Sequence, residues 1–348
     1  MTNQQLASSG RPSVSLVTGG AGFVGSHVVD GLLENGHKVV VLDDLSGGFR
    51  ENVNEDAELA VGSVTDPQMV GSLFQQHKFD YVFHLAAYAA EGLSHFIRRF
   101  NYMNNVVGSM TVINEAVRHE CRCLVFTSSI AAYGAGQTPM TEELTPKPED
   151  PYGIAKYAVE LDLRAAHRIF GLNSIIFRPH NVYGERQNIG DRYRNVVGIF
   201  MNNILQGRPC TIFGDGTQTR AFTHISDVAP IIANSVNYPE AYGQVFNIGA
   251  DTPYSVNDLA RAIQKAMGKD TGITHLSARD EVVHAFSDNS KCARYFGPLE
   301  KTALETGLKE MAAWVYGVGA REGKPFENVE ILRNMPPSWR ELCSKGNQ

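Results

Sequence analysis

No apolar run in this chain approaches the roughly 20 residues that a membrane-spanning helix needs, so we expect no membrane partner. The polar start, residues 1–13, lacks the apolar core of a signal peptide, which predicts a disordered tail and a cytoplasmic protein. Positive charge is not in excess, because 31 Lys and Arg stand against 37 Asp and Glu, leaving a net charge of −6. Without a broad basic surface, nucleic acid is not an expected partner.

Cysteine is also scarce, and histidine is not clustered. The five cysteines contain no Cys-x-x-Cys pair, and we expect Cys121 and Cys123 to be buried thiols rather than a redox pair. The eleven histidines show no His-Glu-x-x-His or similar spacing, so we predict no metal site.

Apolar runs alternate with amphipathic stretches through the first half of the chain. This alternation predicts an α/β fold with a Rossmann-type, doubly wound parallel sheet covered by helices on both faces. A length of 348 residues leaves room for a second lobe. The expected strands are 14–18, 38–42, 58–61, 80–84, 123–127 and 174–178, and the expected helices are 23–35, 67–76, 104–119 and 151–170.

A glycine-rich turn follows the first expected strand, with Gly19, Gly22 and Gly25 spaced three apart. Glycines let the backbone approach a pyrophosphate, and the N-terminus of the following helix supplies free N–H groups. Asp43 and Asp44 end the second expected strand, about 20 residues further on, where a carboxylate binds ribose hydroxyls and repels a 2′-phosphate. The pattern therefore predicts NAD rather than NADP.

Tyr152 and Lys156 are four residues apart on an expected helix, so they share a face. A free tyrosine titrates near pKa ~10, and we expect Lys156 and a nicotinamide cation to lower the pKa of Tyr152 and make it a base. Ser129 follows the fifth expected strand, at the sheet edge where ligands bind, and is the candidate to hydrogen-bond the reacting hydroxyl. These three residues predict the oxidation of an alcohol.

After residue 178 the alternation loosens, and loops rich in Gly, Asn and Arg dominate. A strand at 244–248 is expected to return to the sheet. We therefore expect an NAD-binding Rossmann domain over 14–178 and a smaller, interleaved C-terminal lobe over 179–348 that mainly binds substrate.

Seven motifs occur in a consistent order along most of the chain. Through them the chain resembles the extended short-chain dehydrogenases/reductases, in particular the nucleotide-sugar epimerase and dehydratase group, and within it most of all the UDP-glucose 4-epimerases. The motifs are 18–25, 84–87, 105–108, 128–129 with 133–134, 152–156, 178–184 and 214–220.

The resemblance implies further contacts to NAD beyond the glycines, the two aspartates, Tyr152 and Lys156. Ser63 departs from the aspartate that is usual at its position in the group. The implied contacts are Phe23 and Val24 after the turn, Ser63 and Val64 at the adenine, Leu85, Ala86 and Ala87 along a wall supported by Asn105, and His180 near the nicotinamide.

The resemblance also implies a nucleotide-diphosphate sugar as substrate. Arg220 matches the phosphate-binding arginine of the group, and Asn181 and Asn195 match residues at the diphosphate. Arg279 lies one residue from the usual place of a second arginine. Ala285 aligns with a position that gates pocket width, and its small side chain predicts room for an N-acetyl group. Nearby arginines, Arg186, Arg192 and Arg194, are interpreted as surface charges.

Dehydratases of this group carry an Asp-Glu pair where this chain has Ser129 and Ile130, which disfavours elimination. Epimerisation at C4 needs only one base and a reversible hydride transfer. We therefore predict NAD-dependent 4-epimerisation of UDP-glucose/galactose, or of their N-acetyl forms, through a 4-keto intermediate. The alternatives are an epimerase of UDP-uronic acids or GDP/CDP-sugars, a dehydratase, a net reductase or dehydrogenase, and a non-catalytic NAD-binding protein. Helices 92–119 and 151–170 match those that pair in homodimers of the group.

Overall fold

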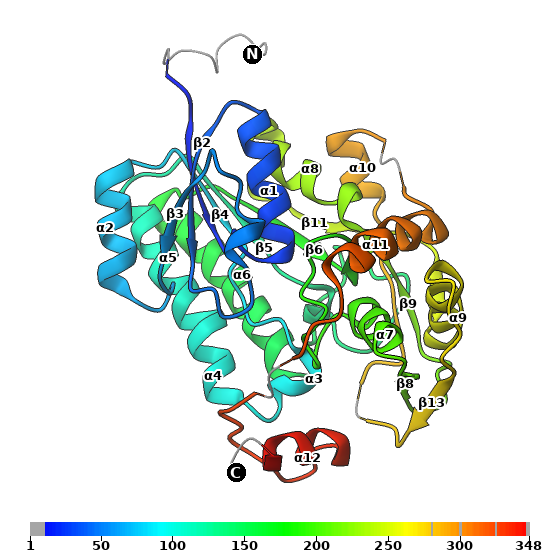
Figure 1. Ribbon diagram of the computed structural model, residues 1–348. Coiled ribbons are helices and arrows are strands. Elements are labelled where there is room, and N and C mark those ends of the chain that lie inside the picture. The colour runs from blue at the N-terminus through cyan, green and yellow to red at the C-terminus, as the bar shows by residue number, and fades with distance from the viewer. Residues whose placement is uncertain (1–10, 280, 299–300, 324–325, 346–348) are drawn as a thin grey trace.

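The computed structural model describes residues 11–279, 281–298, 301–323 and 326–345, and in the last helix side chains as far as Glu341. Within these residues, seven parallel strands form one sheet in the order β11-β6-β5-β4-β1-β2-β3 (Figure 1). The predicted doubly wound α/β fold is confirmed. The strands are β1 (Val14–Thr18), β2 (Lys38–Asp43), β3 (Glu58–Val61), β4 (Tyr81–His84), β5 (Cys123–Thr127), β6 (Ser174–Pro179) and β11 (Val245–Ile248).

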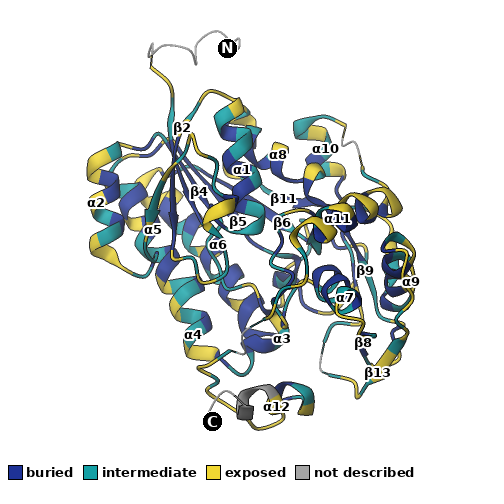
Figure 2. Cartoon of the chain, in the orientation of Figure 1, coloured by how far each residue is buried: buried dark blue, intermediate teal, exposed yellow. Residues whose placement is uncertain are grey.

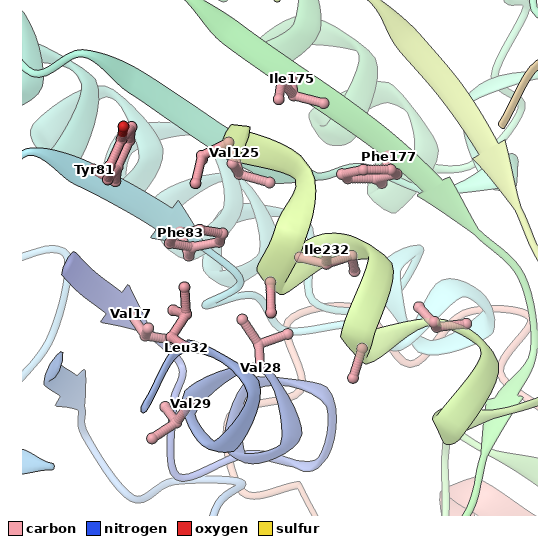
Figure 3. Packing of buried hydrophobic residues seen from close by; sticks show 14 of the residues in the cluster. Val17, Val28, Val29, Leu32, Tyr81, Phe83, Val125, Ile175, Phe177 and Ile232 are labelled. Carbon is pink, nitrogen blue, oxygen red and sulfur yellow. The ribbon is translucent and has the colours of Figure 1, made fainter. Parts of the chain in front are cut away.

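The central strands are buried on both faces, which explains their nearly continuous apolar sequence. In β5, Cys123 and Val125 join one core cluster, whereas Leu124 and Phe126 join the other. Figure 3 shows the first cluster, in which Val28 and Leu32 of α1 and Ile232 of α8 meet the strands. The helices of this face are α1 (Phe23–Glu34) and α8 (Ala229–Asn234), and those of the other face are α2 (Pro67–His77), α5 (Gly108–Arg118) and α6 (Pro151–Phe170).

Local signals fix the ends of α6, the helix that carries Tyr152. The Asp150 carboxylate accepts hydrogen bonds from the backbone N–H groups of Tyr152 and Gly153, each at 2.9 Å, a cap typically worth about 1 kcal/mol. Pro151 occupies the first turn, and Gly171 ends the helix in the left-handed conformation at φ 75°. This cap places Tyr152 in the first turn of α6.

The stretch before α5 is less regular than predicted. It contains the short helices α3 (Glu91–Ser94) and α4 (Arg98–Tyr102) and a π-helical turn at Met103–Val107, which runs directly into α5. A π-turn shifts the faces of a helix, and such turns occur frequently at functional sites.

The second lobe has its own apolar core and small sheets, and it is interleaved with the first. Its chain returns to the main sheet as α8 and as β11, which pairs with β6, so the predicted return of a strand is confirmed. The loosened sequence pattern concealed several helices of this lobe. Its elements are β7 (Val182–Tyr183), α7 (Val196–Leu205), β8 (Cys210–Phe213), β9 (Thr219–Ala221), β10 (Thr223–His224), β12 (Pro253–Ser255), α9 (Val256–Ala266), β13 (Ile273–Leu276), β14 (His284–Ala285) and α11 (Leu304–Val318). Of the last helices, α10 (Ser290–Phe296) packs on the core of the main sheet beside β11, and α12 (Pro337–Lys345) packs against α3.

Most of the predicted tail lies outside the described residues, but its end contacts the sheet. Arg11 forms an ion pair with Asp80 at 2.9 Å, and the Ser13 carbonyl accepts a bond from Lys38. Among the described helices, none is both long and apolar enough to cross a membrane. Burial is strongest where the sheet meets its helices (Figure 2); Cys121, Cys123, Cys210 and Cys292 are buried and free, and Cys343 lies outside the described side chains.

Candidate active site

A cleft of about 1090 Å³ opens at the carboxyl edge of the sheet. The strand order reverses between β1 and β4, and ligands of such sheets bind outside this switch point. All residues that the sequence predicts for cofactor, catalysis and substrate line this cleft except Asn105. No cluster of His, Cys, Asp or Glu able to hold a metal ion occurs among the described residues.

The glycine turn lies at one end of the cleft, between β1 and α1. Gly19 has φ 75°, and a Cβ on Gly25 would stand 2.0 Å from the Gly19 carbonyl oxygen, so neither position tolerates another side chain. No side chain caps the N-terminus of α1, which leaves backbone N–H groups for an anion. This cradle fits the pyrophosphate of NAD.

The two aspartates at the end of β2 have different partners. Asp43 is buried and accepts hydrogen bonds from the backbone of Ala21 at 3.0 Å and Leu45 at 2.8 Å, so it also shapes the glycine turn. Burial raises its pKa. Asp44 is exposed in the cleft and accepts a hydrogen bond from the Ser46 N–H at 2.9 Å. Both aspartates line the cleft at the carboxyl end of β2.

The wall beyond β4 consists of Leu85, Ala86 and Ala87, with Ser63 and Val64 nearby on the cleft surface. Behind it, the Asn105 amide donates to the Tyr88 carbonyl at 3.1 Å and accepts from the Tyr88 N–H at 2.8 Å. Asn105 thus acts from behind the lining, through Tyr88.

Ser129, Tyr152 and Lys156 come together on the wall of the cleft. Ser129 hydrogen-bonds to the Tyr152 phenol and accepts a bond from the Ala131 N–H at 3.1 Å. The Lys156 ammonium lies 5.8 Å from the centroid of the Tyr152 ring. The end of β5 and the first turns of α6 bring these side chains together.

The net effect of the surrounding protein is to raise the pKa of Tyr152, and Lys156 is not among the main groups that act on it, contrary to our expectation. Burial raises this pKa most, and the charges of Asp150 and Glu91 raise it further, against the Ser129 hydrogen bond. Lys156 instead donates to the Thr127 carbonyl at 2.8 Å and lies over the Phe126 ring. Burial lowers the pKa of Lys156 to about 7.

His180 lies at the junction of the two lobes. Its Nε2 is 3.0 Å from the Ala250 carbonyl, and its Nδ1 is 3.2 Å from the Ser287 hydroxyl. A Cβ on Gly249 would stand 2.3 Å from the imidazole, so the ring packs directly on that backbone. Burial lowers the pKa of His180 to about 4, which makes the ring neutral at pH 7.

Arg220 and Arg279 lie together at the second-lobe end of the cleft. Arg220 donates to the carbonyls of Thr219 and Val283, each at 2.9 Å. The Glu281 carboxylate lies 2.9 Å from Arg279 and 3.8 Å from Arg220. Two guanidinium groups share this carboxylate, which favours an additional anion such as a diphosphate.

The remaining predicted substrate residues reach the cleft from separate loops. Asn181 and Asn195 have positive φ angles of 40° and 65°, and Asn tolerates this region better than most residues. Ala285 pairs with Arg220 between β14 and β9 and lies among Ile130, Tyr133 and Met140.

Three further residues of the cleft were missed or misread from the sequence. Arg194 is not a surface charge: it forms a 2.5 Å ion pair with Asp191 and lies over the Tyr88 ring. Glu91 is exposed to the cleft yet surrounded by protein, and burial together with Asp150 raises its pKa to about 7. Trp339 reaches the cleft from α12. No spacing in the sequence signals any of them.

A doubly wound sheet with a glycine cradle and a Ser-Tyr-Lys group at one edge defines an enzyme of the short-chain dehydrogenase/reductase class. Within this class, residues 15–249 match the NAD dependent epimerase/dehydratase family, and the chain belongs to that family. NAD is accordingly its cofactor.

This chain matches individual relatives over nearly the whole of their length. The UDP-glucose 4-epimerase of Mycolicibacterium smegmatis is 34% identical over 302 residues, which are 84% of this chain and 96% of that protein. The UDP-glucose 4-epimerase of Thermotoga maritima, solved with UDP-glucose, is 35% identical with a TM-score of 0.83 over 88% of this chain and 99% of its own. The UDP-N-acetylglucosamine 4-epimerase of Methanobrevibacter ruminantium M1, solved with UDP-N-acetylmuramic acid, is 29% identical with a TM-score of 0.82 over the same shares.

Proposed function

We propose that this chain is an NAD-dependent 4-epimerase of nucleotide-diphosphate sugars, acting on UDP-glucose/galactose or their N-acetyl forms. The observation that carries this proposal is that one cleft holds three groups of residues. The glycine cradle, the pair Ser129 and Tyr152, and the arginines Arg220 and Arg279 of the second lobe all line it. A cofactor on the cradle and a sugar diphosphate on the arginines would share the cleft with the Tyr152 phenol.

In this proposal the side chains of the site remove and return one proton at the 4-hydroxyl of the sugar. NAD, when bound, supplies the acceptor and later the donor of the C4 hydride. Tyr152 removes the proton of the 4-hydroxyl, and Ser129 hydrogen-bonds to the same oxygen. Lys156 ties the start of α6 to the end of β5 through the Thr127 carbonyl, and its protonated form, 5.8 Å from the centroid of the Tyr152 ring, adds a positive charge beside the phenol. The 4-keto sugar then turns, and Tyr152 returns the proton once the opposite face of C4 is reduced.

The predicted binding roles complete the proposal. Gly19, Gly22, Gly25, Phe23 and Val24 hold the pyrophosphate end of NAD; Asp43 and Asp44 hold its ribose. Ser63 and Val64 contact the adenine. Leu85, Ala86, Ala87 and His180 form the wall toward the nicotinamide, and Asn105 supports this wall from behind. On the substrate side, Asn181, Asn195, Arg220 and Arg279 bind the diphosphate, and their support is their place in the cleft.

Ala285 supports acceptance of N-acetyl sugars. Its side chain ends at Cβ, and the neighbours in its cluster are apolar, which suits the methyl of an acetamido group. At the centre of the cleft Ile130 follows Ser129, so the site has no carboxylate at the place where elimination would use one.

Glu91 supports a neutral sugar over a uronic acid. Its carboxylate faces the cleft close enough to Tyr152 to raise the pKa of the phenol. A negative group there repels the carboxylate of a uronate bound at the same centre. UDP-uronic acids and GDP- or CDP-sugars remain the second candidate substrates.

We also propose that the enzyme is a cytoplasmic homodimer. Met103 and Val107 on the π-turn, and Ile154 and Leu161 on α6, are between 40% and 47% exposed, and these two helical segments pack side by side. A second copy covering this face would bury the four apolar side chains. Leu161→Glu is expected to yield monomers in analytical ultracentrifugation. A wild-type protein that already sediments as a monomer would refute the dimer.

Product analysis by NMR tests the proposed reaction directly. The enzyme is incubated with UDP-glucose, UDP-N-acetylglucosamine, UDP-glucuronic acid and GDP-mannose in separate reactions. We expect the C4 epimers of the first two, without accumulation of NADH absorbance at equilibrium. Net NADH formation would indicate a dehydrogenase instead, and a 4-keto-6-deoxy product would indicate a dehydratase.

A further inference from the structure

The C-terminal segment 326–341 folds back over the substrate end of the cleft. The Glu330 carboxylate accepts hydrogen bonds from the backbone N–H groups of Arg99 and Phe100, each at 2.8 Å, at the start of α4. In turn the N–H groups of Glu330 and Ile331 donate to the Phe96 carbonyl at 2.9 and 3.2 Å. Figure 1 shows α12 beneath α3, close to the C-terminus of the chain. The segment is thus fixed to the first lobe by paired backbone contacts.

This anchoring places Trp339 in an aromatic cluster at the cleft. Its side chain is buried, and its ring lies 5.4 Å from that of Tyr193 and 5.9 Å from that of Phe213, both in edge-to-face geometry. A Cβ on Gly92 would stand 3.2 Å from Cη2 of Trp339, so the indole packs tightly against the backbone of α3 at this glycine. Trp339 and Ser338 both line the cleft.

Trp339 also contacts the charged side chain that we assign to the substrate diphosphate. The Arg279 guanidinium lies 4.7 Å from the Phe213 ring centroid and 5.6 Å from that of Trp339. Its Nη2 is 2.9 Å from Glu281. Two aromatic rings and one carboxylate therefore hold a side chain that would otherwise sample many rotamers.

We propose that Trp339 is a positioning residue for the nucleotide diphosphate, and that segment 326–341 is a built-in wall of the substrate site. Trp339 fixes Arg279 for the diphosphate and excludes water from that side of it. This inference rests on the proposed function, because it takes Arg279 as a diphosphate ligand. Preorganisation of a binding group strengthens affinity by reducing the ordering cost of binding. The predicted effect is therefore on substrate binding rather than on the proton and hydride steps.

Variants at the chain's two tryptophans test this inference. For Trp339→Leu we expect the Kd for UDP, measured by calorimetry, and the KM for the nucleotide sugar to rise about tenfold or more, while kcat stays within about twofold. Trp339→Phe keeps an aromatic face and is expected to restore most of the loss. The matched control is Trp314→Leu on α11, which packs in the second-lobe core and should leave KM unchanged.

Binding of NAD and the melting temperature are recorded for each variant. Should Trp339→Leu fail to fold, Glu330→Gln loosens the same segment at an exposed position and is expected to raise KM about threefold, with Glu327→Gln as its control. Wild-type KM in a folded Trp339→Leu variant, or a loss of kcat at unchanged KM, would overturn the inference while leaving the epimerase function intact. A wild-type protein that binds NAD but neither UDP nor any nucleotide sugar would overturn both.

Fluorescence gives a second readout. In a Trp314→Phe background, Trp339 is the remaining tryptophan, and we expect its emission to change when UDP binds but not when inorganic phosphate is added at the same concentration. Emission that is insensitive to saturating UDP would contradict the placement of Trp339 at the nucleotide.

Discussion

Lys156 donates a hydrogen bond to the main-chain carbonyl of Thr127 at 2.8 Å, which joins the first turns of α6 to the end of β5. Thr127 lies two residues before Ser129, so this bond fixes the distance between the strand that carries the serine and the helix that carries Tyr152. The lysine therefore has a structural role in addition to its charge.

Tyr152→Phe is expected to lower kcat for epimerisation by about 10²–10⁴-fold, because the phenol is the proposed general base. Binding of NAD should persist, since the variant removes one oxygen atom. The measurement is the initial rate of C4 inversion, followed by NMR. Tyr157→Phe is the matched control, because Tyr157 is on the same helix but does not line the cleft. Undiminished inversion in Tyr152→Phe would exclude the mechanism.

Lys156 should make the protein more stable as the pH rises from about 7 toward 10. Burial lowers its pKa to about 7 in the folded protein, against ~10.4 in the unfolded chain. Between these values the unfolded state binds more protons, so the free energy of unfolding increases with pH. Lys156→Met lacks this proton linkage. The difference in the free energy of unfolding between the wild type and Lys156→Met, measured by urea unfolding at several pH values, should therefore change with pH by at most a few kcal/mol. A parallel pH dependence of the two proteins would show that Lys156 is charged throughout.

Glu160→Gln should destabilise the fold strongly. The Glu160 carboxylate pairs with Arg178 at 2.5 and 2.9 Å and accepts a bond from Ser128 at 2.5 Å, and its side chain is fully buried. Breaking a buried pair leaves an uncompensated charge, at a cost of about 3–5 kcal/mol. Thermal and urea unfolding measure this loss. Glu305→Gln breaks the exposed pair with Lys265 and should cost less than about 1 kcal/mol.

Ala285→Tyr is expected to reduce turnover of UDP-N-acetylglucosamine by about tenfold or more while sparing UDP-glucose, because the larger ring fills space beside the sugar. The check is kcat/KM for both substrates. Val283→Tyr, two residues away and exposed, serves as the control for a bulky change in this segment. Equal effects on both sugars would show that Ala285 does not gate the pocket.

Glu91→Gln should improve the acceptance of UDP-glucuronic acid relative to UDP-glucose. The wild-type pKa of about 7 means that Glu91 is ionised above this pH, so the preference against uronates should grow with pH between 6 and 8. In Glu91→Gln that pH dependence should vanish. Competition of UDP-glucuronic acid against UDP-glucose, measured as Ki at each pH, reports both effects; a wild-type Ki independent of pH would contradict the role of Glu91.

The sequence by itself determined the sheet, the glycine turn after β1 and the place of Tyr152 in the first turn of α6. Each depends on short-range rules: apolar runs form strands, Gly25 must be glycine because the turn brings it against Gly19, and Asp150 caps α6 and so places Tyr152. Such features are encoded within a few neighbouring residues, which is why the sheet and the glycine turn can be predicted from the sequence.

The tertiary structure alone decided which side chains surround Ser129, Tyr152 and Lys156. Trp339 meets Phe213, and Glu91 comes close to Tyr152, only because segments distant in sequence fold onto the same cleft. The direction of Lys156, toward Thr127 rather than the phenol, likewise depends on how α6 packs on β5. Contacts of this kind follow from the packing of whole elements, which no local spacing of residues records.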